Sequence, residues 1–368
     1  MFHNTIHIVD LIGIHCGMHY YDVAFAEVLR NNGFNVDILS NYNDDNQQKS
    51  FFPMLFGRGK FLSIILLIYS YWKFLFYLLF HRKDIYIYMA YGELYDLLFL
   101  STSFYTKYFF ADVHEVHALK YKDDSKISKF FNNFYKKISA KFIYHSTRTQ
   151  SIFRSIKLPS DRMIYVPHFK YSFKKEYEIN KLSSDISKVF SGDKVKFLFF
   201  GNLSIVKGID TVIDVFGKLP DDLAERIELV IAGKNVDNID FSVIKNKSVH
   251  YSLFDRHIND DELVYLYSKT DFVLLPYKKS SQSGIFAMAC YFKKPMLLTD
   301  IPYFRSMIAD FPSFGRICPV EQYESLVRDA IVNNATYDFY SKIDCDNFLE
   351  TDKINDFVRV FSNYTKLK

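Results

Sequence analysis

The chain has 368 residues, of which 49% are hydrophobic and 24% are charged, and this balance excludes an intrinsically disordered protein. A chain of this length exceeds what one ordinary hydrophobic core organises, so we expect two domains. The formal net charge is only +4, but residues 1–170 carry 20 Lys and Arg against 14 Asp and Glu. Because long apolar runs separate these cations, the pattern favours a membrane surface over nucleic acid as the anionic neighbour. A solvated surface of mixed charge is the alternative.

The cysteines and the first residues indicate a cellular compartment. Cys16, Cys290, Cys318 and Cys345 form no C-x-x-C pair, and their wide spacing predicts neither a disulfide framework nor a zinc site. Free thiols are typical of a reducing cytoplasm. Residues 1–10 lack the basic and then apolar order of a signal peptide, so we expect a cytoplasmic protein.

The chain begins with the pattern of a β–α–β unit. Residues 5–12 are predicted to form a strand, residues 20–32 a helix, and residues 34–39 a second strand. The loop before the helix contains Gly17, whose missing side chain would let a ligand approach the backbone. A tight turn explains this glycine equally well.

Residues 61–80 form an apolar run long enough to cross a bilayer, for which about 20 residues suffice. Lys73 argues against a span because a charge inside the bilayer is costly, and basic residues at both ends give no inside–outside bias. A predicted strand at 84–90 follows at once, so a span would split the sheet. We therefore expect a helix that packs one face on the sheet and dips the other into the membrane interface. A fully buried core helix is the alternative.

A predicted strand at residues 107–113 leads directly into His114, at the position where a sheet presents polar groups to a ligand. His114 could act as a general base, orient an acceptor, or serve only as a hydrogen-bonded loop residue. Residues 120–142 combine seven lysines with apolar residues at helical spacing, which predicts a basic amphipathic helix. Strands are predicted at 141–146 and 163–167.

A second α/β unit is predicted over residues 194–348, after a polar, lysine-rich linker of residues 171–193. The amino-terminal domain is expected to span residues 1–170, and a last helix within 349–368 to return toward it. The elements of the second unit are predicted at residues 196–200, 209–218, 227–232, 249–254, 260–268, 271–275, 295–299, 302–309 and 321–333.

The stretch from Leu274 to Ala289 is the clearest candidate for ligand binding. A strand breaks at Pro276 into a polar loop, and a helical segment begins near Gly284. A helix start attracts phosphate because its N–H groups lack partners and the helix dipole is positive there. Lys207, in a glycine-flanked loop at an earlier strand end, would add a cation for a diphosphate leaving group. An ordinary βα loop is the alternative. No acidic metal-binding cluster follows a strand, so no metal or other cofactor is expected.

Several motifs occur in an order that resembles the GT-B glycosyltransferases of the family 4 type. In the second half they are Phe199-Phe200-Gly201-Asn202-Leu203, Lys207-Gly208-Ile209-Asp210, Ile231-Ala232-Gly233, Arg256-His257-Ile258, and Leu275-Pro276-Tyr277 through Gln282-Ser283-Gly284. In the first half they are Asp10 to Gly17, Asp112-Val113-His114 and Val166-Pro167-His168. The resemblance spans most of the chain.

The resemblance implies an α/β protein of two Rossmann-like, doubly wound domains that face each other across a cleft. It implies transfer of a sugar from a nucleotide-sugar, with retention and without a metal. Lys207 would contact the donor diphosphate beside the N–H groups of Ser283 and Gly284. Gly17, Gly201, Asn202, Gly233, Ile258 and Gln282 complete the implied donor site. His114 corresponds to a histidine near the transferred sugar, and we interpret it as an orienting or polarising catalytic group.

Our leading hypothesis is a cytoplasmic, membrane-peripheral enzyme that uses a UDP- or GDP-sugar. Its acceptor would be a saccharide, in particular a lipid-linked oligosaccharide, in bacterial O-antigen, capsule or exopolysaccharide synthesis. Family members commonly have a phosphate-loop arginine where this chain has Asn202 or Ser204, and two glutamates where it has Ser280 and Met288. A catalytically degenerate saccharide-binding or scaffold protein is therefore the alternative, and a sugar-nucleotide epimerase on the same fold ranks last.

Overall fold

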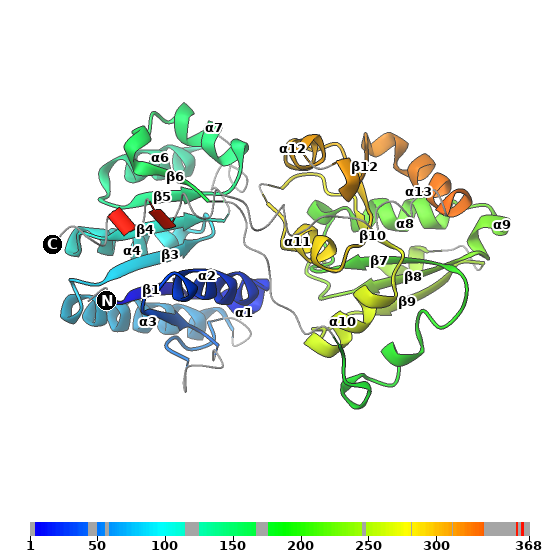
Figure 1. Ribbon diagram of the computed structural model, residues 1–368, viewed down its shortest axis with the longest axis horizontal. Helices are drawn as coiled ribbons and strands as arrows, with labels where there is room; N and C mark the ends of the chain where they lie inside the picture. The colour runs from blue at the N-terminus through cyan, green and yellow to red at the C-terminus, as the bar shows by residue number, and fades with distance from the viewer. Residues whose placement is uncertain are drawn as a thin grey trace. The chain divides into compact units, whose positions relative to one another are not determined.

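The computed structural model describes residues 4–42, 50–55, 59–114, 125–166, 176–244, 248–280, 282–310 and 312–334, together with Val358, Arg359, Ser362 and Asn363. The chain forms two compact α/β units (Figure 1). One comprises residues 1–170 with 349–368, and the other comprises residues 171–348. We call them the amino-terminal and the carboxy-terminal unit.

The amino-terminal unit contains a six-stranded parallel sheet in the order β2-β1-β3-β4-β5-β6. Its strands are β1 (Ile6–Asp10), β2 (Val36–Ser40), β3 (Ile85–Ala90), β4 (Phe109–Val113), β5 (Lys141–Tyr144) and β6 (Met163–Tyr165). Every residue of β1, β3 and β4 is buried. This is expected of central parallel strands that helices cover on both faces.

Helices of the amino-terminal unit connect these strands. They are α1 (Gly13–Cys16), α2 (His19–Asn31), α3 (Lys60–Phe80), α4 (Leu94–Ser101), the 3-10 turn η1 (Thr102–Tyr105), α6 (Lys126–Lys137) and α7 (Thr147–Ser155). The chain steps from β1 to β2 in one direction along the sheet and from β2 to β6 in the other. Since crossovers between parallel strands are right-handed, α2 lies on one face and α3, α4, α6 and α7 lie on the other.

The predicted strands and the helices at 20–32, 61–80 and 120–142 are confirmed, although the last is shorter than expected. Helix α4 was not predicted, because its start lacks the usual Ser, Thr or Asn cap. Buried Asp96 organises this start instead, because its carboxylate accepts hydrogen bonds from the N–H groups of Tyr91 and Glu93, both at 2.9 Å, and from the Tyr88 hydroxyl at 2.8 Å. The residues predicted as a loop after β1 contain the single-turn helix α1.

The carboxy-terminal unit contains a second six-stranded parallel sheet, in the order β12-β11-β10-β7-β8-β9. Its strands are β7 (Val195–Phe200), β8 (Ile227–Ala232), β9 (His250–Phe254), β10 (Phe272–Leu275), β11 (Met296–Thr299) and β12 (Gly315–Cys318). Its helices are α8 (Ile209–Gly217), α9 (Asp221–Ala224), α10 (Asp260–Lys269), α11 (Gly284–Tyr291), α12 (Pro302–Asp310) and α13 (Tyr323–Val332). Cys290, buried in α11, and half-buried Cys318 form no disulfide.

Part of the stretch expected to be a linker packs onto the carboxy-terminal unit. Ile186, Val189 and Phe190 are buried, and the Tyr265 hydroxyl of α10 donates to the Val189 carbonyl oxygen at 2.8 Å. The Phe190 N–H donates to the Glu228 carboxylate of β8 at 2.7 Å. Residues 186–190 of the expected linker therefore belong to the core of the carboxy-terminal unit.

Two glycines let the loops at the carboxyl ends of the central strands approach each other closely. Gly208 has φ +78°, and a Cβ atom there would overlap the carbonyl group of Pro276, which follows β10. Gly233 has φ +142°, and a Cβ atom there would overlap the carbonyl group of Gly201, which follows β7. Both positions combine a backbone conformation and a steric limit that only glycine meets.

The first prediction concerns Gly208. Gly208→Ala should destabilise the carboxy-terminal unit by at least about 2 kcal/mol, because the new methyl group meets backbone atoms in an unfavourable conformation. Gly217→Ala, at the end of α8 where an added Cβ meets nothing within 4 Å, should be neutral or stabilising by up to about 1 kcal/mol. Denaturant unfolding of both variants measures the difference, and equal stabilities would contradict the steric argument.

Candidate functional site

The carboxy-terminal sheet has its topological switch point between β7 and β10. From β7 the chain proceeds to β8 and β9 on one side, whereas β10 leads to β11 and β12 on the other. The two strands pair directly, with Phe272 opposite Phe197. Ligands of open α/β sheets bind outside the carboxyl ends of strands at such a point. The loop 201–208 after β7 and the loop 276–283 after β10 both begin there.

These two loops are joined through their backbones. The Lys278 N–H donates to the Val206 carbonyl oxygen at 3.0 Å, and Gly208 lies against Pro276. Lys278 also forms an ion pair with Asp210 in the first turn of α8. The backbone contacts hold the loops as one rigid surface, which preorganises the groups that they carry.

Lys207 and Ser283, predicted separately for donor binding, are brought together by Tyr277. The Lys207 ammonium lies 3.9 Å from the centre of the Tyr277 ring, and the Tyr277 hydroxyl lies 3.3 Å from Ser283 Oγ. Ser283 is the N-cap of α11, and its Oγ accepts the Phe286 N–H at 3.2 Å. The result is a cation fixed over an aromatic ring beside a capped helix start that carries no acidic residue in its first turn.

The other predicted donor residues of this region lie around the same junction. Gly201 has φ +109° and faces Ile285 in the first turn of α11. Asn202 is exposed and Gly233 is buried beneath Gly201. Gln282 and Gly284 flank the cap residue on either side. The structure therefore gathers seven of the predicted donor residues: Gly201, Asn202, Lys207, Gly233, Gln282, Ser283 and Gly284.

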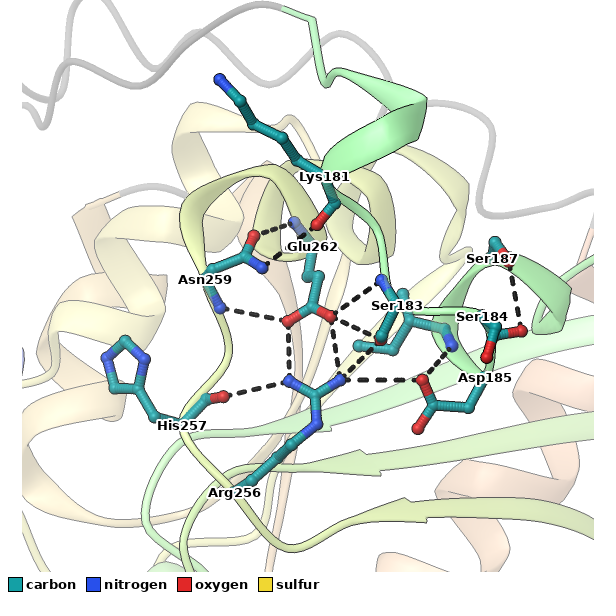
Figure 2. A network of polar contacts seen from close by, with 10 residues as sticks. Lys181, Ser183, Ser184, Asp185, Ser187, Arg256, His257, Asn259 and Glu262 are labelled. Carbon is teal, nitrogen blue, oxygen red and sulfur yellow. Dashed lines mark hydrogen bonds and ion pairs between the residues drawn. The ribbon is translucent and has the colours of Figure 1, made fainter.

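Ile258 lies farther along the sheet. It is buried in the loop after β9, an edge strand that β8 separates from β7. The resemblance places Arg256 in a base-contacting loop, but its guanidinium group is bound within the protein (Figure 2). It donates to both carboxylate oxygens of buried Glu262, at 2.7 and 2.8 Å, and to Ser183 Oγ at 2.8 Å.

Figure 2 shows that Glu262 is the centre of this network. Its carboxylate also accepts the Asn259 N–H at 3.2 Å and the Ser183 hydroxyl at 2.6 Å. Burial raises the pKa of Glu262, but Arg256 and the other donors outweigh this effect and hold the pKa below its ordinary value. Arg256 thus fixes the loop that carries Ile258 and fastens residue 183 to α10.

The amino-terminal unit has a buried polar cluster at the carboxyl ends of its central strands. It contains Asp10 at the end of β1, Asp112 in β4, His114 after β4 and His145 after β5, all less than 10% exposed. His145 Nε2 lies 2.6 Å from Asp112 Oδ1, and His145 Nδ1 lies 2.9 Å from the Val166 carbonyl oxygen. Both ring nitrogens of His145 therefore face hydrogen-bond acceptors, which fixes the orientation of its ring.

His114 is held within this cluster. Its Nε2 lies 3.7 Å from Asp112 Oδ1 and 3.2 Å from Met89 Sδ. Its ring stacks on that of His145, with centres 5.1 Å apart, and meets the Tyr21 ring edge-on at 4.5 Å. The predicted position at a strand end is confirmed, and packing fixes the orientation of the imidazole. Its catalytic role stays a prediction.

The buried acids Asp10 and Asp112 of this cluster, and the neighbouring buried Asp22 of α2, have pKa values that are shifted in different directions. Burial raises the pKa of Asp10 and, together with the negative charge of Asp10, raises that of Asp22 well above its ordinary range. Burial also acts on Asp112, but the charges of His145 and His114 and the hydrogen bonds from His145 and Tyr21 lower its pKa overall. The surroundings thus stabilise the carboxylate form of Asp112 and disfavour the carboxylate forms of Asp10 and Asp22.

The remaining predicted residues of the first half are the glycines near β1 and the pair Pro167-His168. Gly17, predicted for donor binding, ends α1 with φ +71°, and an added Cβ would meet nothing within 4 Å. Its conformation rather than lack of space therefore requires glycine. Gly13 differs, since an added Cβ would lie 2.5 Å from Asp10 Oδ2. Pro167 and His168 lie outside the described residues.

Comparison with known proteins identifies this architecture. Residues 183–331 match the family model of the group 1 glycosyl transferases. The chain has the GT-B fold, and its carboxy-terminal unit matches the group 1 glycosyl transferases. No curated protein sequence matches it.

Solved structures of glycosyltransferases share this fold over the whole chain. WaaG, a glycosyltransferase involved in lipopolysaccharide biosynthesis, superposes with a TM-score of 0.68 and 13% identity over 99% of this chain and 100% of WaaG. A glycosyltransferase from Rickettsia africae gives 0.67 and 14% over 99% of each chain. Anabaena HepE, solved with UDP-glucose, gives 0.63 and 13% over 98% of this chain and 100% of HepE.

Sequence reasoning named Tyr277 and Asp112 only as parts of motifs, without a role, and it missed Asp22 and His145. Tyr277 directly follows the Leu275-Pro276 break, and this position was a usable signal. Asp112 stands two residues before His114 and was likewise noticeable. Asp22 and His145 gave no signal, because only the packing of the sheet brings them to Asp10 and Asp112.

The buried cluster of the amino-terminal unit also has the donor types of a metal site. Ligand atoms of Asp112, His114 and His145 all lie within 4.8 Å of one another. His145 and Asp112 are already joined by a direct hydrogen bond, and the other nitrogen of His145 is bonded to Val166. A divalent cation would have to displace the shared proton, so hydrogen bonding accounts for this cluster as it stands.

The second prediction uses the opposite pKa shifts of Asp22 and Asp112. A raised pKa contributes stability at acid pH that is lost as pH rises above the ordinary value of 3.8. Asp22→Asn should therefore become progressively more stable relative to wild type between pH 4 and pH 8. A lowered pKa contributes stability above 3.8 that is lost as pH falls. Asp112→Asn should cost about 3 kcal/mol at neutral pH and less in acid.

Thermal unfolding of both variants and wild type from pH 8 down to about pH 2 provides the measurement, because the Asp22 effect falls above pH 4 and the Asp112 effect falls below it. The two difference curves should slope in opposite directions. Parallel curves would show that the acids share one protonation state.

Proposed function

We propose that this glycosyltransferase transfers a sugar from a UDP- or GDP-sugar to a saccharide acceptor, and that the acceptor is lipid-linked. We further propose that it acts at the cytoplasmic face of the plasma membrane in bacterial surface polysaccharide synthesis. The observation that carries the donor assignment is the junction of Lys207, Tyr277 and Ser283 at the switch point. It combines a fixed cation with a helix start, which is the chemistry that a diphosphate requires.

In this proposal the donor diphosphate lies between the Lys207 ammonium and the first turn of α11. Charge develops on the leaving phosphate as the bond to the sugar breaks. A cation and N–H groups that are already in place stabilise that charge without reorganisation. Tyr277 keeps Lys207 in position by contact with its ring face. No metal is needed in this scheme, because protein groups supply the positive charge.

His114 has the role of orienting or polarising group for the transferred sugar. Its ring is fixed by the stack with His145 and the edge contact with Tyr21, so it loses little rotational freedom on binding. Reaction with retention requires no strong side-chain nucleophile, since the leaving phosphate can accept the acceptor proton.

Two neighbours support the choice of substrates. HepE was solved with UDP-glucose and with UDP and glucose, which favours a uridine nucleotide as donor. WaaG is a glycosyltransferase involved in lipopolysaccharide biosynthesis, which favours a surface glycolipid as acceptor. Both proteins are 13% identical to this chain, and these relations guide the choice of nucleotides for the first experiments.

A catalytically degenerate binding protein is the second candidate, and the loop after β10 is the observation in its favour. Ser280 and Met288 occupy the spacing at which relatives carry two glutamates. Ser280 donates its hydroxyl to the Gln282 carbonyl oxygen, and Met288 is buried in α11. Ribose recognition by carboxylates at these positions is thus lost, and backbone groups must replace it.

The third prediction tests the donor site. Lys207→Ala should weaken UDP binding about 10- to 100-fold, the range for a lost charge-assisted hydrogen bond. Tyr277→Leu should weaken it less, because the cation remains without its support. Lys218→Ala removes an exposed lysine of the same unit that pairs with Asp214 and should leave binding unchanged. Calorimetric titration with UDP and GDP measures all four proteins.

If neither nucleotide binds wild type at millimolar concentration, the binding-protein candidate replaces the enzyme. If Lys207→Ala binds like wild type, the donor assignment to this junction is wrong.

The fourth prediction concerns His114. His114→Ala should lower kcat for the nucleotide-sugar that binds by about 100-fold or more and leave UDP affinity unchanged. Thermal unfolding controls for the loss of packing in the cluster. His145→Ala, which disturbs the same stack but leaves the His114 imidazole in place, should retain more activity than His114→Ala. Equal losses would assign both residues a structural role.

A further inference from the structure

Helix α3 has one face packed on the amino-terminal sheet. Phe74 and Leu78 are fully buried, and the Phe74 ring meets those of Tyr86 in β3 and Phe99 in α4, with centres 5.8 and 5.9 Å apart. Lys73 is satisfied on this side, because its ammonium donates to the Phe51 carbonyl oxygen at 2.6 Å. The packing anchors α3 as a part of the fold.

The opposite face of α3 is apolar and exposed. A stripe at helical spacing has side chains that are each at least 45% exposed: Phe61, Ile65, Ile68, Trp72, Phe76 and Phe80. At 1.5 Å per residue the stripe is about 28 Å long. The fully buried core helix considered from the sequence is therefore excluded. An apolar patch of this extent on a folded unit indicates an interaction surface.

The exposed face continues onto neighbouring elements. Leu94 and Leu98 of α4 and Phe104 and Tyr105 of η1 are also 45% exposed or more. Helix α4 packs on α3 through Phe99, and the Thr106 hydroxyl after η1 donates to the Arg82 carbonyl oxygen after α3 at 3.1 Å. We call the exposed apolar residues of α3, α4 and η1 together the α3 surface.

Cations border the α3 surface. Lys60 at the start of α3, Arg82 and Lys83 after its end, and Lys107 after η1 are all exposed. Helix α3 contains no acidic residue. An apolar face with a basic border complements the interface of a bilayer that contains anionic lipids, whose headgroups attract Lys and Arg while the acyl boundary accepts aromatic and aliphatic side chains.

The length and composition of α3 would also allow it to cross a membrane. The packing contradicts a span. Phe74 and Leu78 lie on a sheet whose next strand, β3, begins at Ile85, with only four residues between it and the end of the helix. Crossing the bilayer would separate α3 from β3 and expose its packed face to lipid.

We infer that the α3 surface docks the protein onto anionic lipid bilayers, with α3 lying in the plane of the interface and its exposed stripe among the upper acyl chains. Helix α3 runs antiparallel to the strands, since its end leads into the start of β3, and its 21 residues exceed the six of β3. The Phe61 end therefore reaches the edge of the sheet where Asp112 and His114 lie. A lipid-linked acceptor anchored beside it would present its saccharide there, a consequence that rests on the proposed function.

Trp72 makes the inference directly measurable. It is the only tryptophan in the chain and lies in the middle of the exposed stripe. Vesicles of phosphatidylcholine with phosphatidylglycerol should shift its emission to the blue, and the full-length protein should float with them. Lipids labelled with a quencher near the headgroup should quench Trp72 more than lipids labelled at the chain end, since the helix lies at the interface.

Matched variants separate the apolar contribution to vesicle binding from the electrostatic contribution. Ile65→Ser, Ile68→Ser and Phe76→Ser together should lower vesicle affinity at least about 100-fold. Arg82→Gln with Lys83→Gln should lower it about 25-fold on anionic vesicles only. Ile179→Ser with Val320→Ser, exposed apolar residues of the other unit, should change nothing. Lys207→Ala should bind vesicles like wild type, so that failure of the donor site and failure of the α3 surface are distinguished.

Other outcomes overturn the inference. Absence of flotation and of an emission change would exclude membrane docking. A blue-shifted Trp72 without vesicles, together with a dimer in light scattering, would assign the surface to a second copy of the chain. Stronger quenching from the chain end would show a span. Thermal unfolding and UDP titration of each variant establish that it is folded.

Discussion

The contact of Gly208 with Pro276 is the constraint on which the donor site depends. Only a residue without a side chain lets the loop after β7 lie directly against the loop after β10, and the second close approach, of Gly233 to Gly201, holds the neighbouring turn. These contacts fix two backbones from strands that are adjacent in the sheet but 75 residues apart in the chain. Lys207 and Tyr277 are thereby placed side by side, with the Lys207 ammonium over the Tyr277 ring. The site is thus preorganised by backbone packing, before any ligand contributes.

In the amino-terminal unit, hydrogen bonds between buried polar side chains, rather than backbone packing, hold the candidate residues in place. Its buried acids and imidazoles are joined by hydrogen bonds, and the pKa of Asp112 is lowered beside His145 while burial raises the pKa values of Asp10 and Asp22. Removing a single member leaves a buried charge or an unmatched donor, which costs several kcal/mol. Such a cluster holds the His114 ring in one orientation. Hydrogen bonds within the cluster offset the desolvation cost of burying these groups, and apolar side chains could not form such bonds.

Much of this arrangement could be predicted from the sequence, because buried parallel strands are continuous apolar runs and their carboxyl ends meet at one edge. Lys207 and Ser283 were predicted for that reason. The role of Arg256 could not be predicted, since its guanidinium group binds Glu262 and Ser183, 73 positions away. Nor could the bridge made by Tyr277, which depends on where a side chain points. The start of α4 was missed because Asp96 caps it from within the core.

Helix α3 is the clearest case in which the sequence alone could not show which way the side chains face. Its sequence is apolar around the whole circumference, so a core helix, a membrane span and an interfacial helix fit it equally by composition. Only the fold shows that Phe74 and Leu78 face the sheet and that Trp72 and Phe76 face away. Within the described part of the amino-terminal unit nothing covers this second face, so several large apolar side chains are in contact with water. This contact is unfavourable in proportion to the apolar area that is exposed. A bilayer would relieve that cost without altering the sheet, and it would bring a lipid-linked acceptor to the edge where His114 is held.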